Sequence, residues 1–185
     1  MSPILGIFAS QGRVASTSYE SIATVTSSGS SGTISFTSIP STYTHLQIRG
    51  IGRGTISDNN TYPDIRFNND ATSNYSWHIL DGYGTSISAS GAANQTSAGV
   101  PTFTAATSTG NIFGVLVLDI LDYKNTNKYK TIRYLGGHDQ NGAGGILRFG
   151  SGNWRSTSAI TRIDLIVGSQ NWASNTTFAL YGIRG

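Results

Sequence analysis

Apolar and polar residues alternate along many short segments of the 185-residue chain. In residues 33–39, Ile34 and Phe36 fall on one side of an extended chain, and serine and threonine fall on the other. Leu147 and Phe149 likewise form one apolar face of a short segment. A period of two is typical of half-buried β-strands. The pattern predicts strands at residues 19–26, 33–39, 43–50, 64–68, 75–81, 128–135, 146–149, 159–168 and 176–183.

The longest nearly uninterrupted apolar run, residues 112–123, is predicted to be the central strand. Phe113, Val115 and Val117 precede Asp119 on one face, while isoleucine and leucine occupy most of the other. A strand that is apolar on both faces must be covered on both faces. The second face would meet either another layer of the same domain or another subunit. A helix is the alternative for a run of this length, but its valines, its isoleucines and Gly114 favour a strand.

Polar segments separate the predicted strands. Residues 84–109 are mostly serine, alanine, glycine and threonine, which predicts one or two edge strands or a long functional loop. Residues 136–145 are expected to form a glycine-rich loop that carries His138 and Asp139. The chain thus contains roughly nine or ten strands and no helical period elsewhere. It is predicted to be all-β, a single β-sandwich whose strand number and loop lengths suit a jelly roll.

A short N-terminal arm, residues 1–16, differs from the sandwich domain predicted for residues 17–185. An isolated arm cannot bury its own apolar residues, which are Pro3, Ile4, Leu5, Ile7 and Phe8. The arm either folds onto its own domain as a first strand or docks on a neighbouring subunit or a larger assembly. Its opening lacks a basic region and its apolar run is short, so we expect no signal peptide.

The composition supports the all-β prediction and argues against several functions. Charged residues make up only 11% of the chain, well below the roughly 25% of an average globular protein. Serine, threonine, glycine and asparagine, which favour turns and strand edges, take their place. The chain has no cysteine, so neither a disulfide nor a thiolate metal site can form. No apolar run reaches the roughly 18 residues of a membrane span, so we expect no membrane partner.

The net charge of +3 is spread thinly along the chain, which argues against a nucleic-acid partner. Proteins that bind nucleic acid usually concentrate their basic residues in a stripe or an arm. Here only Lys124, Lys128, Lys130 and Arg133 come close to a cluster. A solvated loop accounts for these residues without a partner.

No catalytic or metal-binding motif stands out, so we expect no enzyme, no metal and no cofactor. The three histidines show none of the paired spacings of zinc sites, and His138 with Asp139 would supply only two ligands. The G-x-S-x-G motif of serine hydrolases does not occur. Asp119 and Asp122 would point to opposite faces of one strand. We therefore expect Asp119 to be a strand-end charge or an ion-pair partner at an interface.

Two tryptophans and a histidine are the candidate ligand contacts. Trp154 and Trp172 each follow a short segment of serine and asparagine. Tryptophan rings in polar loops suit stacking on sugars or contact with a subunit. The alternative is that each ring covers the edge of the core. His138, in its expected glycine-rich loop, is the third candidate contact for a glycan.

Several stretches of the sequence resemble a family of virion proteins from tailed bacteriophages. They are residues 2–7, 19–25, 39–49, 74–78, 119–123 and the closing Phe-Ala-Leu-Tyr-Gly-Ile of residues 178–183. The similarity therefore extends over nearly the whole chain. Proteins of this family are described as structural proteins, capsid decoration proteins or tail-fibre components, and no catalytic motif comes with the resemblance.

The resemblance implies a non-enzymatic virion protein that is assembled in the cytoplasm of the host bacterium. We expect a homotrimeric capsid decoration (cement) protein that binds and stabilises the shell of the major capsid protein. The apolar residues of the arm would then contact a subunit or the capsid, and the subunit interface would contain Phe113, Val115, Val117 and Asp119. The alternative is a receptor-binding module of a tail or head fibre, in which Trp154, Trp172 or His138 contacts a host surface glycan.

Overall fold

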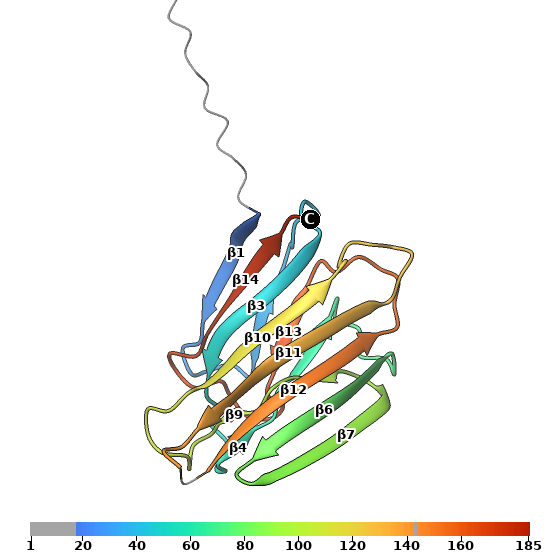
Figure 1. Cartoon of the computed structure of the whole chain (residues 1–185). Helices are drawn as coiled ribbons and strands as arrows, with labels where there is room; N and C mark the ends of the chain where they lie inside the picture. The colour runs from blue at the N-terminus through green and yellow to red at the C-terminus, as the bar shows by residue number, and fades with distance from the viewer. Residues whose placement is uncertain (1–17, 143) are drawn as a thin grey trace, which may run out of the picture.

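The computed structural model describes residues 18–142 and 144–185 of the chain. Within these residues the protein is all-β, with fourteen strands and no helix, and its two main sheets lie face to face (Figure 1). This arrangement confirms the prediction of a β-sandwich, while the narrower prediction of a jelly roll stays a prediction. The predicted arm, residues 1–16, lies outside the described residues.

The larger sheet has eight strands, and every neighbouring pair is antiparallel. From edge to edge its strands are β1 (Tyr19–Thr26), β14 (Thr177–Ile183), β3 (His45–Gly52), β10 (Gly114–Leu121), β11 (Lys130–Asp139), β12 (Gly145–Trp154), β6 (Tyr75–Tyr83) and β7 (Ser86–Gln95). The predicted central strand is therefore β10, which lies in the interior of the sheet between β3 and β11.

The smaller sheet has four strands, in the order β2 (Thr33–Phe36), β13 (Ile163–Ile166), β5 (Asp64–Phe67) and β8 (Ala98–Gly99). A separate short ladder pairs β4 (Asn60–Thr61) with β9 (Phe103–Thr104). Because the smaller sheet has half as many strands, it leaves part of the larger sheet uncovered. Its last strand, β8, contacts β12 and β6, whereas almost every residue of the edge strand β7 is exposed.

The core lies between the two sheets and follows the period of two. On β10, Leu116, Leu118 and Ile120 point toward the smaller sheet and are buried, while Val115 and Val117 on the opposite face are exposed. The smaller sheet contributes the opposite wall of the core, which includes Ile34, Phe36, Ile65, Phe67, Ile163 and Leu165. One face of each strand is thus satisfied within the chain, as expected for a sandwich strand.

The prediction that residues 136–145 form a glycine-rich loop is wrong, because several of them belong to strands. Strand β11 continues to Asp139 and β12 begins at Gly145, so the connection between them is short. The glycines serve the strands: a Cβ at Gly136 would lie 2.6 Å from a side-chain atom of Pro101. Close packing therefore explains this glycine better than loop flexibility does.

The expectation that the four neighbouring basic residues are solvated is wrong for Lys130, which is fully buried at the start of β11. Its ammonium group donates hydrogen bonds to the carbonyl oxygens of Asn125 (2.6 Å), Lys128 (2.9 Å) and Thr157 (3.2 Å). Three acceptors match the three donors of an ammonium group. The buried cation therefore ties the β10–β11 connection to the segment after β12.

Candidate functional site

The outer face of the larger sheet, which points away from the smaller sheet, carries a patch of exposed apolar side chains. The strand register places Val117, Leu135, Phe149 and Leu80 side by side across β10, β11, β12 and β6. A neighbouring row adds apolar residues on β3, β10, β12 and β7. We define the outer patch as the eight residues Ile51, Leu80, Ile87, Val115, Val117, Leu135, Leu147 and Phe149.

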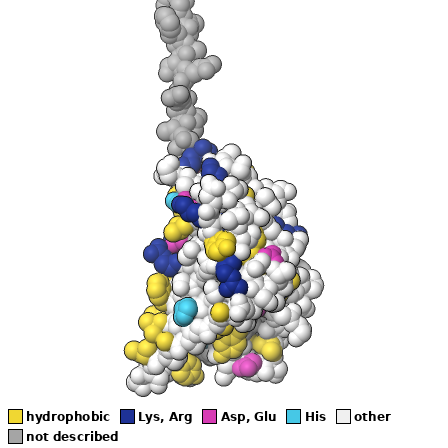
Figure 2. Space-filling model, turned by 90° about the vertical axis from the view of Figure 1, so that its right-hand side faces the viewer, with side chains coloured by type: hydrophobic (Ala, Val, Ile, Leu, Met, Phe, Trp, Pro, Cys, Tyr) yellow, Lys and Arg dark blue, Asp and Glu magenta, His cyan; other side chains and the backbone are white. Residues whose placement is uncertain are grey.

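Each side chain of the outer patch is substantially exposed, from 37% for Val117 to 79% for Ile87. The space-filling view shows hydrophobic side chains gathered at the lower left of the molecule (Figure 2). Single exposed apolar residues are normal, but a contiguous patch of this kind marks an interaction surface. The sequence analysis left open whether the second face of β10 meets another layer of the same domain or another subunit. In the single chain this face is exposed to solvent.

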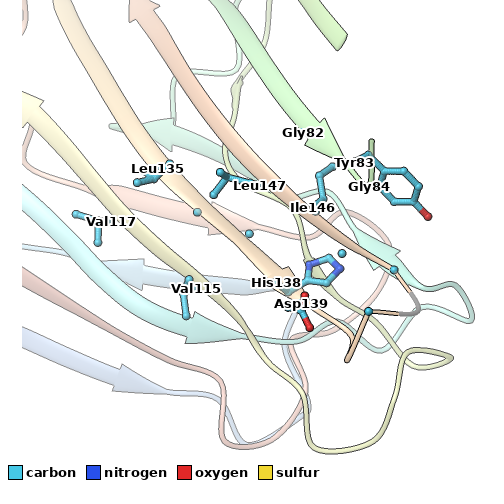
Figure 3. A pocket seen from close by; sticks show the side chains of 15 residues that line it. Gly82, Tyr83, Gly84, Val115, Val117, Leu135, His138, Asp139, Ile146 and Leu147 are labelled. Atoms are coloured by element: carbon cyan, nitrogen blue, oxygen red, sulfur yellow. The ribbon is translucent and has the colours of Figure 1, made fainter. Parts of the chain in front are cut away.

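Four residues of the outer patch, Val115, Val117, Leu135 and Leu147, line a groove of about 830 Å³ whose other lining residues include several glycines (Figure 3). In the row that contains Val115 and Leu147, Gly137 and Gly82 alternate with the larger residues. Gly137 has a φ of 147°, and a Cβ there would collide with the carbonyl oxygen of Ile146. That position therefore requires glycine. A Cβ at Gly82 would have no neighbour closer than 4.0 Å, so the groove is open there.

A polar band borders the outer patch and contains Asp119. Its carboxylate accepts hydrogen bonds from Gln47 Nε2 (2.7 Å) and from Arg133 Nη2 (3.2 Å), which lie on the neighbouring strands β3 and β11. Tyr19 extends the band by donating to Gln47 Oε1 (2.8 Å). The charge of Asp119 is thus balanced within its own chain.

The four predicted interface residues do not all lie on one surface. Val115, Val117 and Asp119 share the outer face of β10, and the first two belong to the outer patch. Phe113 precedes β10 and is half-buried. The sequence pattern also placed Leu147 and Phe149 on one face of their strand. That face is the outer one, because Ile146, Arg148 and the other even-numbered residues of β12 are buried on the inner face. Leu135 and Leu80 lie in one row with Val117 and Phe149. The sequence pattern did not predict that these residues are neighbours.

The prediction that Trp154 and Trp172 offer their rings to a glycan is wrong, because both are buried. Trp154 is 2% exposed, packs 5.5 Å from the Phe67 ring, and donates a hydrogen bond to Asp70 Oδ2 (2.7 Å). Trp172 is fully buried and its indole N–H donates to the carbonyl oxygen of Leu165 (3.2 Å). Both rings turn inward because each indole N–H finds an acceptor inside the protein.

His138 lies near the end of β11 instead of in a loop, and it lines the groove together with Asp139. Figure 3 shows both side chains at the hairpin end of the groove, beyond Leu135 and Leu147. Burial lowers the pKa of His138, so its imidazole is neutral at pH 7. This residue is the one predicted glycan contact that borders a cavity, and it stays a prediction.

The described residues supply no obvious metal or basic site. Within residues 18–142 and 144–185, no three histidine, aspartate or glutamate side chains form a group that could hold a metal ion. The basic residues expected to come closest to a cluster are dispersed, because Lys130 is buried and Lys128 and Arg133 pair with Asp122 and Asp119.

No helix in the described part of the chain is long and apolar enough to span a membrane. Comparisons of the chain with protein-family models, with curated proteins and with solved structures found no match. The function is therefore argued from the outer patch and from the rest of the structure.

Proposed function

We propose that this chain is a non-enzymatic virion structural protein of a tailed bacteriophage. More specifically, the proposal is that the chain is a homotrimeric decoration protein that binds and stabilises the capsid shell. The sequence resemblance supports the virion assignment. The outer patch is the observation that carries the assembly part of the proposal, because it gives the folded chain an apolar surface that a partner can cover.

The outer patch is large enough to drive association. Fully burying one large aliphatic or aromatic side chain contributes about 1.5–3 kcal/mol, so a side chain that is half-exposed contributes on the order of 1 kcal/mol. Eight such residues would contribute on the order of 8 kcal/mol, which is comparable with the estimated 4–15 kcal/mol cost of association. Association is then favourable once other contacts are added, and the predicted arm would supply such contacts.

Copies of the same chain are the proposed cover for the outer patch. Asp119 is paired with Arg133 at the border of the patch. Arg49, which lies opposite Val117 on β3 and forms no salt bridge within the described residues, would have to stay at the solvated rim of the interface. The rows of larger side chains next to Gly82 and Gly137 offer ridges and hollows that can interlock. The capsid shell would then be contacted by the arm, whose residues 3–8 lie outside the described structure.

A matched pair of leucine substitutions tests this proposal. Leu135 in the outer patch and Leu121 outside it are 50% and 47% exposed, and both lie on the outer face of the larger sheet. We expect sedimentation velocity to show a trimer for the wild type and for Leu121→Asp, and a shift toward monomer for Leu135→Asp. Circular dichroism would check that both variants keep the β fold.

A wild-type chain that sediments as a monomer, or equal behaviour of the two variants, would contradict the proposed interface. The decoration role has its own test, in which purified protein is added to phage capsids that lack it. Saturable binding at threefold positions of the shell is expected, and a reconstruction of the virion that places the chain elsewhere would refute it.

The alternative function, a glycan-binding module of a tail or head fibre, loses two of its three predicted contacts. Trp154 and Trp172 are buried in the core and cannot stack on a sugar. His138 alone is a weak basis for a receptor site. A glycan site, if the chain has one, must therefore use other residues.

A further inference from the structure

A second cavity opens near the free edge of the larger sheet, where the smaller sheet ends. It has a volume of about 250 Å³, and we call it the edge cavity. Tyr62 and Asp64 line it from the smaller-sheet side, and Trp77 and Arg148 line it from β6 and β12. The cavity exists because β8, the last strand of the smaller sheet, has only two residues and leaves the inner face of β6 partly uncovered.

Two aromatic side chains form walls of the edge cavity. Trp77 is half-buried on β6, whereas the other two tryptophans of the chain are buried. Tyr62 is 58% exposed. Aromatic rings with a polar group at one end suit a site that is partly apolar and partly wet. A sugar matches such a site, because its ring has an apolar C–H face and polar hydroxyl groups at its edge.

Arg148, which lines the edge cavity, forms a nearly buried ion pair with Asp81. Arg148 donates to both carboxylate oxygens of Asp81, from Nε (2.7 Å) and from Nη2 (2.6 Å). Its Cζ lies 5.8 Å from the centre of the Tyr62 ring. No hydrogen bond from Nη1 is formed within the described residues. This nitrogen is therefore a donor that a ligand can use.

An ion pair on the inner face of a sandwich needs a reason, because apolar residues of similar volume are often at least as stable there. A second carboxylate lies nearby: Asp64 also lines the cavity, and burial raises the pKa of Asp64. Tyr134 lies on the same inner face, with its ring over Gly150, and its buried hydroxyl has no partner in the described chain. Buried hydroxyls are nearly always paired, so this corner of the core is built for more polar contacts than the chain itself makes.

We propose that the edge cavity binds one neutral pyranose residue of a glycan. Trp77 and Tyr62 pack against the C–H face of the ring, Arg148 donates to a ring hydroxyl, and Asp64 accepts from a neighbouring one. The volume is below the roughly 300–1,000 Å³ of pockets for drug-sized ligands, which suits a single ring. A neutral sugar fits because Asp81 already balances the charge of Arg148.

The edge cavity is independent of the proposed trimer. Arg148 and Trp77 lie on the inner face of the larger sheet, whereas the outer patch lies on the opposite face. Copies of the chain that cover the outer patch would leave the cavity accessible. The proposal therefore survives if the virion assignment fails, and the reverse is also true.

Intrinsic fluorescence provides a direct test, because Trp77 is the one tryptophan of three that is not buried. The full chain would be titrated with methyl glycosides of glucose, galactose, mannose, rhamnose and N-acetylglucosamine. We expect at least one of them to change the emission in a saturable manner. A methyl glucuronide serves as the charged comparison and should bind more weakly.

Two tyrosine variants make the test specific. Tyr62→Ala should weaken binding by about tenfold or more, as expected for an aromatic anchor. Tyr129→Ala removes a tyrosine that is equally exposed, at 56%, outside the cavity and should bind like the wild type. Leu135→Asp should also keep sugar binding, whatever it does to the trimer.

Three results would overturn the proposal. One is that none of the neutral glycosides changes the fluorescence at the highest concentration that the assay allows. Another is that Tyr62→Ala and Tyr129→Ala titrate alike. The third is that the glucuronide alone binds, which would exclude a neutral sugar as the ligand.

Discussion

Removing Asp81 should destabilise the protein far more than removing Asp81 and Arg148 together. In the wild type, the guanidinium of Arg148 is held by both carboxylate oxygens of Asp81, and the two side chains are only 11% and 12% exposed. Asp81→Leu leaves a cation that is nearly buried and has lost its counter-charge. The double variant Asp81→Leu, Arg148→Met instead fills the same space with apolar atoms.

The size of the effect follows from this burial. Breaking a buried pair by removing one partner costs about 3–5 kcal/mol. The lower end applies here, because Arg148 lines the edge cavity and water can reach it from there. A loss of about 3 kcal/mol corresponds to a fall of about 6–12 °C in Tm for a domain of this size. The double variant should lie within about 1 kcal/mol of the wild type, since such replacements are often neutral.

Urea unfolding, followed by tryptophan fluorescence, would measure the free energy of unfolding of the wild type, both single variants and the double variant. The four values form a double-mutant cycle, from which the coupling energy of the pair is obtained. Calorimetry would give the Tm values independently. Single variants that lose less than about 1 kcal/mol would behave like an exposed pair and would refute the reasoning from burial. So would a double variant that loses as much as the two single losses combined.

Two further substitutions test other parts of the structure. Gly150→Ala should cost about 1–3 kcal/mol, because a Cβ there would collide with the ring of Tyr134, whereas Gly110→Ala, with no atom within 4 Å, should be nearly neutral; thermal unfolding of both variants checks this. Asp70→Asn should cost on the order of 1 kcal/mol at pH 7. Burial alone would raise the pKa of Asp70, but hydrogen bonds from Thr72, Trp154 and Asn74 outweigh it and hold the pKa well below its ordinary value of 3.8. A lowered folded-state pKa stabilises the protein above pH 3.8, and this stabilisation is lost as the pH falls further. Between pH 7 and pH 2 the free energy of unfolding should therefore fall less steeply for the variant than for the wild type. Equal slopes for the two proteins would contradict the lowered pKa of Asp70.

The sequence pattern predicts the strands well where one face alone is apolar. Tyr19–Thr26 is found with its predicted bounds, and β3, β5 and β14 differ from prediction by two residues or fewer at each end. Prediction fails where glycine replaces the inward or outward residue. The strand at residues 146–149 proves to run from Gly145 to Trp154, because Gly150 and Gly152 leave room for side chains from β11 and so interrupt the apolar pattern without ending the strand.

The same limit explains why the candidate sites were only partly visible in the sequence. Leu147 and Phe149 were recognised as a face, but the pattern cannot tell whether that face meets the core or solvent. Only the pairing of β12 with β11 and β6 aligns Phe149 with Leu135 and Leu80 to make the outer patch. Likewise, Trp154 and Trp172 have polar neighbours in sequence, whereas their acceptors, Asp70 and the carbonyl of Leu165, come from other strands or loops.

The unequal size of the two sheets connects the outer patch with the edge cavity. A sheet of eight strands has two faces, and four shorter strands cover only part of one of them. The uncovered outer face carries the outer patch, whose apolar side chains favour association with a surface that excludes water. The partly covered inner face near β6 is instead lined by Trp77, Arg148 and Asp64, so it favours a small polar ligand. Because the two surfaces lie on opposite sides of the same strands, a chain that associates with its copies through the outer patch would still present the edge cavity to solvent.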